Sequence, residues 1–245
     1  EGVREHNLKD ISVEFPLARL VCVTGVSGSG KSTLVQDVLA PALMRHFGKA
    51  TETPGAHDRL LGADHLGDVV FVDQSPIGKT ARSNPASYVG AWDAVREIFA
   101  TAPISRQRGY TASKFSFNSG DGRCPTCGGS GFEHVEMQFL SDVYLRCPDC
   151  DGKRFRNETL EVRISGAARA RRADGSPFGE LSVAEVLELT VTEALEFFAD
   201  RSDVRSRLLP LADVGLDYLR LGQPVPTLSG GEAQRLKLAG FLAEA

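Results

Sequence analysis

Three segments near the N-terminus have the hydrophobic pattern of β-strands. Residues 11–15 alternate apolar and polar positions, which is typical of a strand with one buried face. Residues 20–24 form an apolar run that we expect to pair with residues 11–15. Residues 68–73 are mostly apolar and predict a central strand. Cys22 lies within the second run, where a small buried side chain is the simplest interpretation.

Helical periodicity dominates elsewhere. Residues 32–47 predict a helix that Pro41 kinks or splits, because proline has no amide hydrogen. Val95, Ile98 and Phe99 share the expected buried face of a second helix. The helices predicted from the spacing of apolar residues beyond residue 90 lie near 91–100, 183–189, 192–199 and 203–213. The hydroxyl side chains that suit their N-caps are Ser182 and Thr190 or Thr192.

A glycine-rich loop separates the run at 20–24 from the helix predicted at 32–47. It fits the phosphate-binding pattern of Gly, four residues, then Gly-Lys-Ser. Backbone N–H groups and the helix N-terminus would hold phosphates, Lys31 would reach the β- and γ-phosphates, and Ser32 would ligate Mg²⁺. The alternative is a glycine-rich turn that binds no nucleotide. The expected nucleotide-binding residues are Gly25, Ser27, Gly28, Ser29, Gly30, Lys31, Ser32 and Thr33, together with Gln74 further along the chain.

Two cysteine pairs flank a predicted hairpin. Residues 135–139 and 143–145 alternate like hairpin strands, and residues 159–164 predict a further strand. The pairs Cys124-Pro-Thr-Cys127 and Cys147-Pro-Asp-Cys150 are separated by 19 residues. Such pairs predict a structural Zn²⁺ bound by four thiolates, with about 10–16 kcal/mol of metal binding coupled to folding.

Other interpretations of this cysteine-rich segment are less favoured. A redox-active dithiol would need only one pair. His134 lies in the hairpin, but four cysteines already complete a zinc site. Residues 124–131 also have the cysteine–glycine spacing of chaperone-type zinc repeats, although only one full repeat is present. The cysteines favour a metal site in a reducing cytoplasm over disulfides.

Composition and charge are those of an ordinary globular chain with an uneven charge distribution. Of the 245 residues, 42% are hydrophobic and 24% are charged, and no apolar run approaches the roughly 18 residues that span a bilayer. The net charge is −4, yet residues 76–156 hold 11 Lys/Arg and 8 Asp/Glu. A basic middle region permits contact with a phosphate backbone. Both ends of the sequence look cut, so we expect a part of a longer protein.

Basic and aromatic residues alternate after the predicted strand at 68–73. Gln74 follows this strand directly, where a glutamine could reach Mg²⁺ and an attacking water, although glutamine at a strand end is commonplace. Residues 106–117 then mix cations with aromatic rings, a pattern that suits nucleic-acid contact. The alternative is a solvated loop whose aromatic rings are buried in the core.

A second glycine-rich stretch opens the last predicted helix. Pro224 and Pro226 prevent an earlier start, which places Ser229 at the N-cap. Two glycines at a helix N-terminus favour an anion site, although ordinary capping also explains them. With the upstream loop and Gln74, the stretch resembles the signature motif of ATP-binding-cassette (ABC) ATPases, in which two modules enclose ATP. The signature residues are Leu228, Ser229, Gly230, Gly231 and Glu232.

The predicted zinc hairpin between Gln74 and the signature indicates one particular family among the ABC ATPases. The sequence is similar to the C-terminal ATPase module of the UvrA family of DNA-repair ATPases. The resemblance implies an α/β ABC-ATPase fold with an inserted helical signature domain that carries the zinc hairpin. The resemblance to UvrA is based on segments 73–78, 82–85, 108–110, 115–118 and 228–237. The implied domains are an ATP-binding core over 1–80, an insert over 81–227 with the hairpin at about 120–156, and the signature helix over 228–245.

The same resemblance implies ATP-dependent recognition of damaged DNA in nucleotide excision repair. Lys31 and Gln74 would be catalytic, with ATP, Mg²⁺ and Zn²⁺ as cofactors. The implied partners are damaged double-stranded DNA, a second ATPase module, a homodimer partner and a downstream helicase-like repair protein, in the bacterial cytoplasm at the nucleoid and without a membrane. The implied DNA contacts are Lys79, Arg82, Arg108, Lys114, Arg123, Arg146, Lys153 and Arg154.

Three alternatives remain open. Residues 133–138 also suit shorter UvrA paralogues, some of which act in drug tolerance. A transporter-type ATPase is disfavoured by the zinc cysteines and the long insertion, and a chaperone-type zinc module is disfavoured by the phosphate-binding pattern. The family's Walker B carboxylates and switch histidine should follow the signature and are not in this sequence. We therefore expect weak ATP binding and little hydrolysis by this chain alone, with His6 a weak candidate for stacking adenine.

Overall fold

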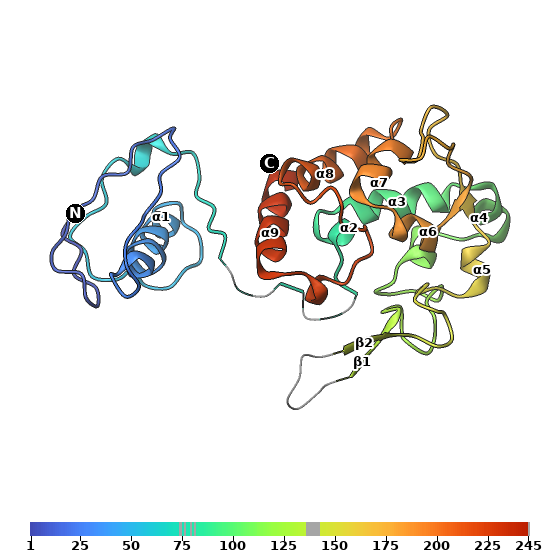
Figure 1. Ribbon diagram of the computed structural model, residues 1–245, viewed down its shortest axis with the longest axis horizontal. Coiled ribbons are helices and arrows are strands. Elements are labelled where there is room, and N and C mark those ends of the chain that lie inside the picture. Colours follow the sequence, from blue (N-terminus) through green and yellow to red (C-terminus); the bar gives the residue numbers. More distant parts are fainter. Residues whose placement is uncertain (74, 76, 79, 81, 136–142, 245) are drawn as a thin grey trace. The chain divides into compact units, whose positions relative to one another are not determined.

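The computed structural model describes residues 1–73, 75, 77–78, 80, 82–135 and 143–244 (Figure 1). The side chains of His134 and Glu244 are also outside the description. The chain divides into two compact units, Glu1–Phe71 and Val72–Ala245. The division falls earlier than residue 80, and the signature helix belongs to the second unit.

The first unit is built around one helix that changes its hydrogen-bond pattern. A π-helix, η1 (Thr33–Leu39), leads directly into α1 (Ala40–His46). Pro41 near the start of α1 has no amide hydrogen for the carbonyl of Asp37, four residues earlier. The Gly55 amide donates to that carbonyl instead, at 2.8 Å. The helix is therefore not split at Pro41, and its type changes from π to α one residue before it. A short 3-10 helix, η2 (Ala63–His65), follows.

The strands predicted in the first unit are not formed among the described residues. The prediction is wrong for segments 11–15, 20–24 and 68–73. A strand needs a hydrogen-bonded neighbour, and here the described pairing is limited to an isolated bridge between Val3 and Ile11. Leu20 is fully exposed, and Cys22 is exposed rather than buried. The core of this unit is correspondingly small, around Val3, Leu34 and Val38.

The second unit is a helical body in which α8 (Ser202–Asp213) packs against three other helices. These are α3 (Ala91–Ala100), α7 (Val191–Phe197) and α9 (Gly230–Glu244). Val95, Ile98 and Phe99 of α3 are buried, as expected. The shorter helices are α2 (Pro85–Tyr88), α4 (Pro103–Arg108), η3 (Ala112–Phe115), α5 (Asn157–Leu160), α6 (Val183–Glu188) and η4 (Val225–Thr227). Figure 1 shows this helical body with the β1–β2 hairpin projecting from it.

Capping boxes begin α6 and α7. The Ser182 hydroxyl accepts a hydrogen bond from the Glu185 amide, and the Glu185 carboxylate accepts one from the Ser182 amide. Thr190 and Glu193 repeat this arrangement at α7. The structure therefore selects Thr190 as the N-cap. The Thr192 hydroxyl donates to the Asp217 carbonyl instead.

The strands of the second unit form two small antiparallel pairs. β1 (Phe132–Val135) pairs with β2 (Val143–Arg146), with Phe132 opposite Arg146. The predicted hairpin strands, 135–139 and 143–145, are confirmed at Val135 and over 143–145; residues 136–142 lie outside the described chain, and β1 begins earlier, at Phe132. β3 (Arg163–Ile164) pairs with β4 (Leu181–Ser182).

The strand predicted at 159–164 is correct only for its last two residues, Arg163 and Ile164. α5 extends through Leu160, because the buried Thr159 hydroxyl donates to the Gly122 carbonyl at 3.2 Å and holds this turn against the body. Among the described helices of the chain, none combines the length and apolar character needed to cross a membrane.

Candidate functional site

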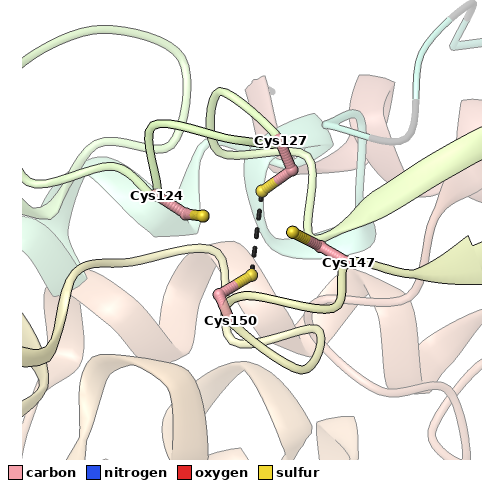
Figure 2. A group of neighbouring side chains, drawn as sticks. All are labelled: Cys124, Cys127, Cys147 and Cys150. Atoms are coloured by element: carbon pink, nitrogen blue, oxygen red, sulfur yellow. Dashed lines mark hydrogen bonds between the residues drawn. The ribbon is translucent and has the colours of Figure 1, made fainter.

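The four paired cysteines converge on one point beside the hairpin (Figure 2). Their sulfur atoms all lie within 4.8 Å of one another. The Sγ atoms of Cys127 and Cys150 are 3.7 Å apart. A tetrahedral zinc with Zn–S bonds of about 2.3 Å separates its sulfurs by about 3.8 Å. The donor set therefore fits zinc, and the predicted ligands Cys124, Cys127, Cys147 and Cys150 are brought together.

Backbone hydrogen bonds hold the two cysteine turns in place. The Cys147 amide donates to the Gly131 carbonyl at 2.9 Å, and the Gly131 amide donates to the Cys127 sulfur at 3.2 Å. Burial raises the pKa of the Cys150 thiol, and the neighbouring Cys127 sulfur adds to this effect. Thiolates are the metal-binding form, so metal binding here must release protons.

Arg154 connects the cysteine turns to the helical body. Its carbonyl accepts a hydrogen bond from the Cys124 amide at 2.8 Å, and its Nη2 donates to the Gly222 carbonyl at 2.8 Å. The guanidinium lies over the rings of Phe117 and Phe132. Arg154 is 2% exposed, so it offers no accessible charge to DNA, contrary to the sequence-based expectation.

Lys114 is also buried and paired inside the protein. Its ammonium donates to the carboxylates of Glu158, at 2.8 Å, and Asp121, at 3.1 Å. Burial lowers the pKa of Lys114, but these two hydrogen bonds outweigh it and hold the pKa above its ordinary value. Asp121 is seven residues away in sequence, whereas Glu158 is 44 residues away. Lys114 therefore has a structural position rather than the exposed one expected of a DNA contact.

The other expected DNA contacts occupy different environments. Arg123 donates to the carbonyls of Asn118 and Gly120 and thereby braces the turn before Cys124. Arg146 and Lys153 are exposed next to the cysteine turns. Two more of the expected DNA contacts are described: Arg82 is half-buried, and Arg108 is exposed and paired with Glu161. Lys79 lies outside the described residues, as does Gln74.

The glycine-rich loop of the first unit is closed by its own lysine. Lys31 Nζ donates to the carbonyls of Gly25, at 3.0 Å, and Val26, at 2.8 Å. The Asn7 side-chain Nδ2 donates to the Gly28 carbonyl and fixes the other side of the loop. Gly30 has φ +93°, and a Cβ there would lie 2.6 Å from a Leu8 methyl. Only glycine fits this position without movement of its neighbours.

The signature stretch forms a capping box at the start of α9. The Ser229 hydroxyl and amide both donate to Glu232 Oε2 at 2.7 Å, and the Glu232 amide donates back to Ser229 Oγ. Tyr218 donates to Glu232 Oε1 at 2.7 Å. These bonds from Tyr218 and Ser229 hold the pKa of Glu232 below its usual range. The expected N-cap at Ser229 is confirmed, and Tyr218 is a contact that the sequence pattern did not indicate.

Comparison with known proteins identifies the relatives of this chain. No family model matches it. UvrABC system protein A of Thermus thermophilus is 50% identical over 239 residues, which are 98% of this chain and 24% of that protein. Its counterpart in Methanothermobacter thermautotrophicus is 50% identical over 242 residues, 99% of this chain and 24% of that protein. Over almost its whole length, the chain is homologous to UvrA.

A solved structure agrees with this relationship. The crystal structure of UvrA2 from Deinococcus radiodurans matches with a TM-score of 0.82 and 45% sequence identity, covering 100% of this chain and 29% of that one. This UvrA-related chain thus has a mixed helix and sheet fold similar to UvrA2. It spans about a quarter of the length of the curated UvrA relatives, 24% in both proteins above.

We predict that this chain binds one zinc through the four cysteines and that Cys147→Ser abolishes this binding. One ligand is lost from a buried set of four, and structural zinc contributes about 10–16 kcal/mol in small zinc domains. Metal content measured by mass spectrometry after gel filtration should fall from one zinc per chain to near zero, and the thermal midpoint should fall.

Cys22→Ser is the matched control, because Cys22 is exposed and outside the cluster. It should keep its zinc and its thermal midpoint. Full zinc retention by Cys147→Ser, or equal loss in both variants, would contradict the assignment.

Proposed function

We propose that this chain is the ATP-binding and signature part of a UvrA-type ATPase that inspects DNA for damage in nucleotide excision repair. The observation that carries the proposal is the homology to UvrA over 98% of the chain. That homology spans the glycine-rich loop, the cysteine cluster and the signature helix. The activity, the ABC-type fold of the ATP-binding core and the partners are parts of this proposal.

The first step of the proposal is nucleotide binding at residues 25–33. Lys31 exchanges its two carbonyl partners for β- and γ-phosphate oxygens, and the loop amides and helix N-terminus hold the rest of the charge. The Ser32 hydroxyl ligates Mg²⁺. Gln74, which the structure does not describe, orients the attacking water. The capped N-terminus of α9 faces the nucleotide of a second ATPase module.

The second step is DNA contact near the zinc site. Arg146 and Lys153 are exposed in this region, whereas Lys114 and Arg154 are buried; Arg156 is exposed too, and its Nε donates to the Arg123 carbonyl. We infer that DNA contact depends on Arg146 and Lys153, with Lys79 and Arg82 as further candidates. Cations that contact phosphates read no base sequence. Recognition of damage would therefore depend on how easily the duplex deforms.

A drug-tolerance paralogue of UvrA is the second candidate. The similarity to UvrA2 is the observation that favours it. The two candidates differ in the ligand: a repair protein should bind damaged duplex more tightly than intact duplex when ATP is present, and a tolerance protein should not.

We predict that Lys31→Ala weakens ATP binding by about 10–100-fold, the effect of losing hydrogen bonds between an ammonium and phosphates. Equilibrium titration with a fluorescent ATP analogue and Mg²⁺ measures the affinity. Lys9→Ala is the control, because Lys9 is an exposed lysine of the same unit outside the loop. Equal affinities for the two variants would show that nucleotide, if bound, is not held by this loop.

We predict that Lys153→Ala weakens duplex binding and lowers the log–log salt slope by about one, because one phosphate contact is lost. Fluorescence anisotropy of a labelled duplex at several salt concentrations provides the slope. Arg201→Ala is the control: Arg201 is exposed at the N-cap of α8 and outside the zinc region. The interface is refuted if Lys153→Ala keeps the slope of the wild-type chain.

A further inference from the structure

Lys237 is a buried lysine on the signature helix. It lies eight residues after Ser229, about two turns along α9, and is 8% exposed. Its Nζ donates to the Asp73 carboxylate, to the Asp73 carbonyl at 3.2 Å and to the Ser75 hydroxyl at 2.8 Å. An ammonium has three N–H donors, so these acceptors satisfy all of them.

The partners of Lys237 are the first residues of the second unit. That unit begins at Val72, so the chain leaving Phe71 is held by the ammonium within a few residues. Ser75 also donates to Asp73 Oδ1 at 2.8 Å, which closes a three-residue cluster. The hydrogen bond from Lys237 lowers the pKa of the Asp73 carboxyl, and the bond from Ser75 adds a smaller effect. This carboxylate therefore stays charged at neutral pH. We call Asp73, Ser75 and Lys237 the linker clamp.

Burial makes the linker clamp hard to open. The Lys237 side chain is 10% exposed, whereas that of Asp73 is 43% exposed. Separation of the pair would leave a buried ammonium without partners, which is strongly unfavourable. The linker and α9 therefore stay together.

A second contact holds the same linker against the segment that precedes the signature. The Val225 amide donates to the Ser83 carbonyl at 2.8 Å. Gly78 has φ +69°, and a Cβ there would lie 2.9 Å from the Val225 side chain. Glycine is thus required for the close approach of the linker to η4. The linker is fixed to the signature segment on both sides of the capped helix start.

We propose that Lys237 is a positioning residue that couples the first unit to the signature helix by clamping the linker between them. A displacement of the first unit on nucleotide binding then reaches α9 through Asp73 and Ser75. The nucleotide part of this inference rests on the proposed function. The clamp itself does not.

The test compares Lys237→Met with Arg235→Met in the full chain. Methionine keeps the length of the side chain and removes the charge, and Arg235 is an exposed cation on the same helix. Hydrogen–deuterium exchange without nucleotide should rise over 72–78 in Lys237→Met, because the Asp73 carboxylate that accepts from the Ser75 amide is no longer held. Arg235→Met should match the wild-type chain there. Unchanged exchange over 72–78 in Lys237→Met would overturn the clamp.

The second arm adds a non-hydrolysable ATP analogue with Mg²⁺. In the wild-type chain and in Arg235→Met, nucleotide should change exchange over 229–240. In Lys237→Met this change should be lost, while the nucleotide affinity stays within about twofold because the loop is intact. If nucleotide still changes exchange over 229–240 in Lys237→Met as much as in the wild-type chain, the coupling is refuted.

The two arms separate the clamp from the proposed function. A wild-type chain that binds no nucleotide refutes the proposed function and the coupling, and the first arm still decides whether the clamp exists. If Lys237→Met fails to fold, Asp73→Asn weakens the same ion pair from its exposed side and must raise exchange over 72–78. A chain that tolerates Asp73→Asn without local change contradicts the clamp.

Discussion

The buried guanidinium of Arg154 is the interaction on which the second unit depends. Its backbone, at φ +69°, closes the first cysteine turn through the Cys124 amide, and its side chain reaches the Gly222 carbonyl. Burial lowers its pKa to about 10, and Cys127 opposes this shift. The charge therefore persists at neutral pH. Because a buried cation requires its partners, the cysteine cluster and the helical body are held as one structure rather than as a body with an appended zinc finger.

The signature helix is part of the same structure. The Gly222 segment leads through η4 to Ser229, and the linker from the first unit is bound to that helix at Lys237. Residues 221–237 thus connect three features: Gly222 accepts from Arg154 beside the cysteine turns, Ser229 caps α9, and Lys237 binds the linker. A change of the metal site can therefore affect the elements proposed to face nucleotide, without any contact between metal and nucleotide.

Features that depend on residues close together in the sequence were predicted correctly. Helix positions, the caps at Ser182 and Ser229 and the convergence of the cysteines follow from periodicity and spacing. The strand predictions near the N-terminus were wrong, because apolar alternation does not reveal whether a segment has a hydrogen-bonded neighbour. Local composition also could not separate the exposed Lys153 from the buried Lys114, whose partner Glu158 is 44 residues away. Lys237 was missed for the same reason, because its partner Asp73 is 164 residues away.

Hydrogen–deuterium exchange of the zinc-loaded chain, before and after removal of the metal by a chelator, tests most directly whether the zinc site and the signature segment form one structure. If Arg154 joins them, chelation should raise exchange over 122–135 and 143–155 and also over 220–225, with residues 1–71 unchanged. Increased exchange confined to the cysteine turns, with 220–225 fully protected, would contradict this account.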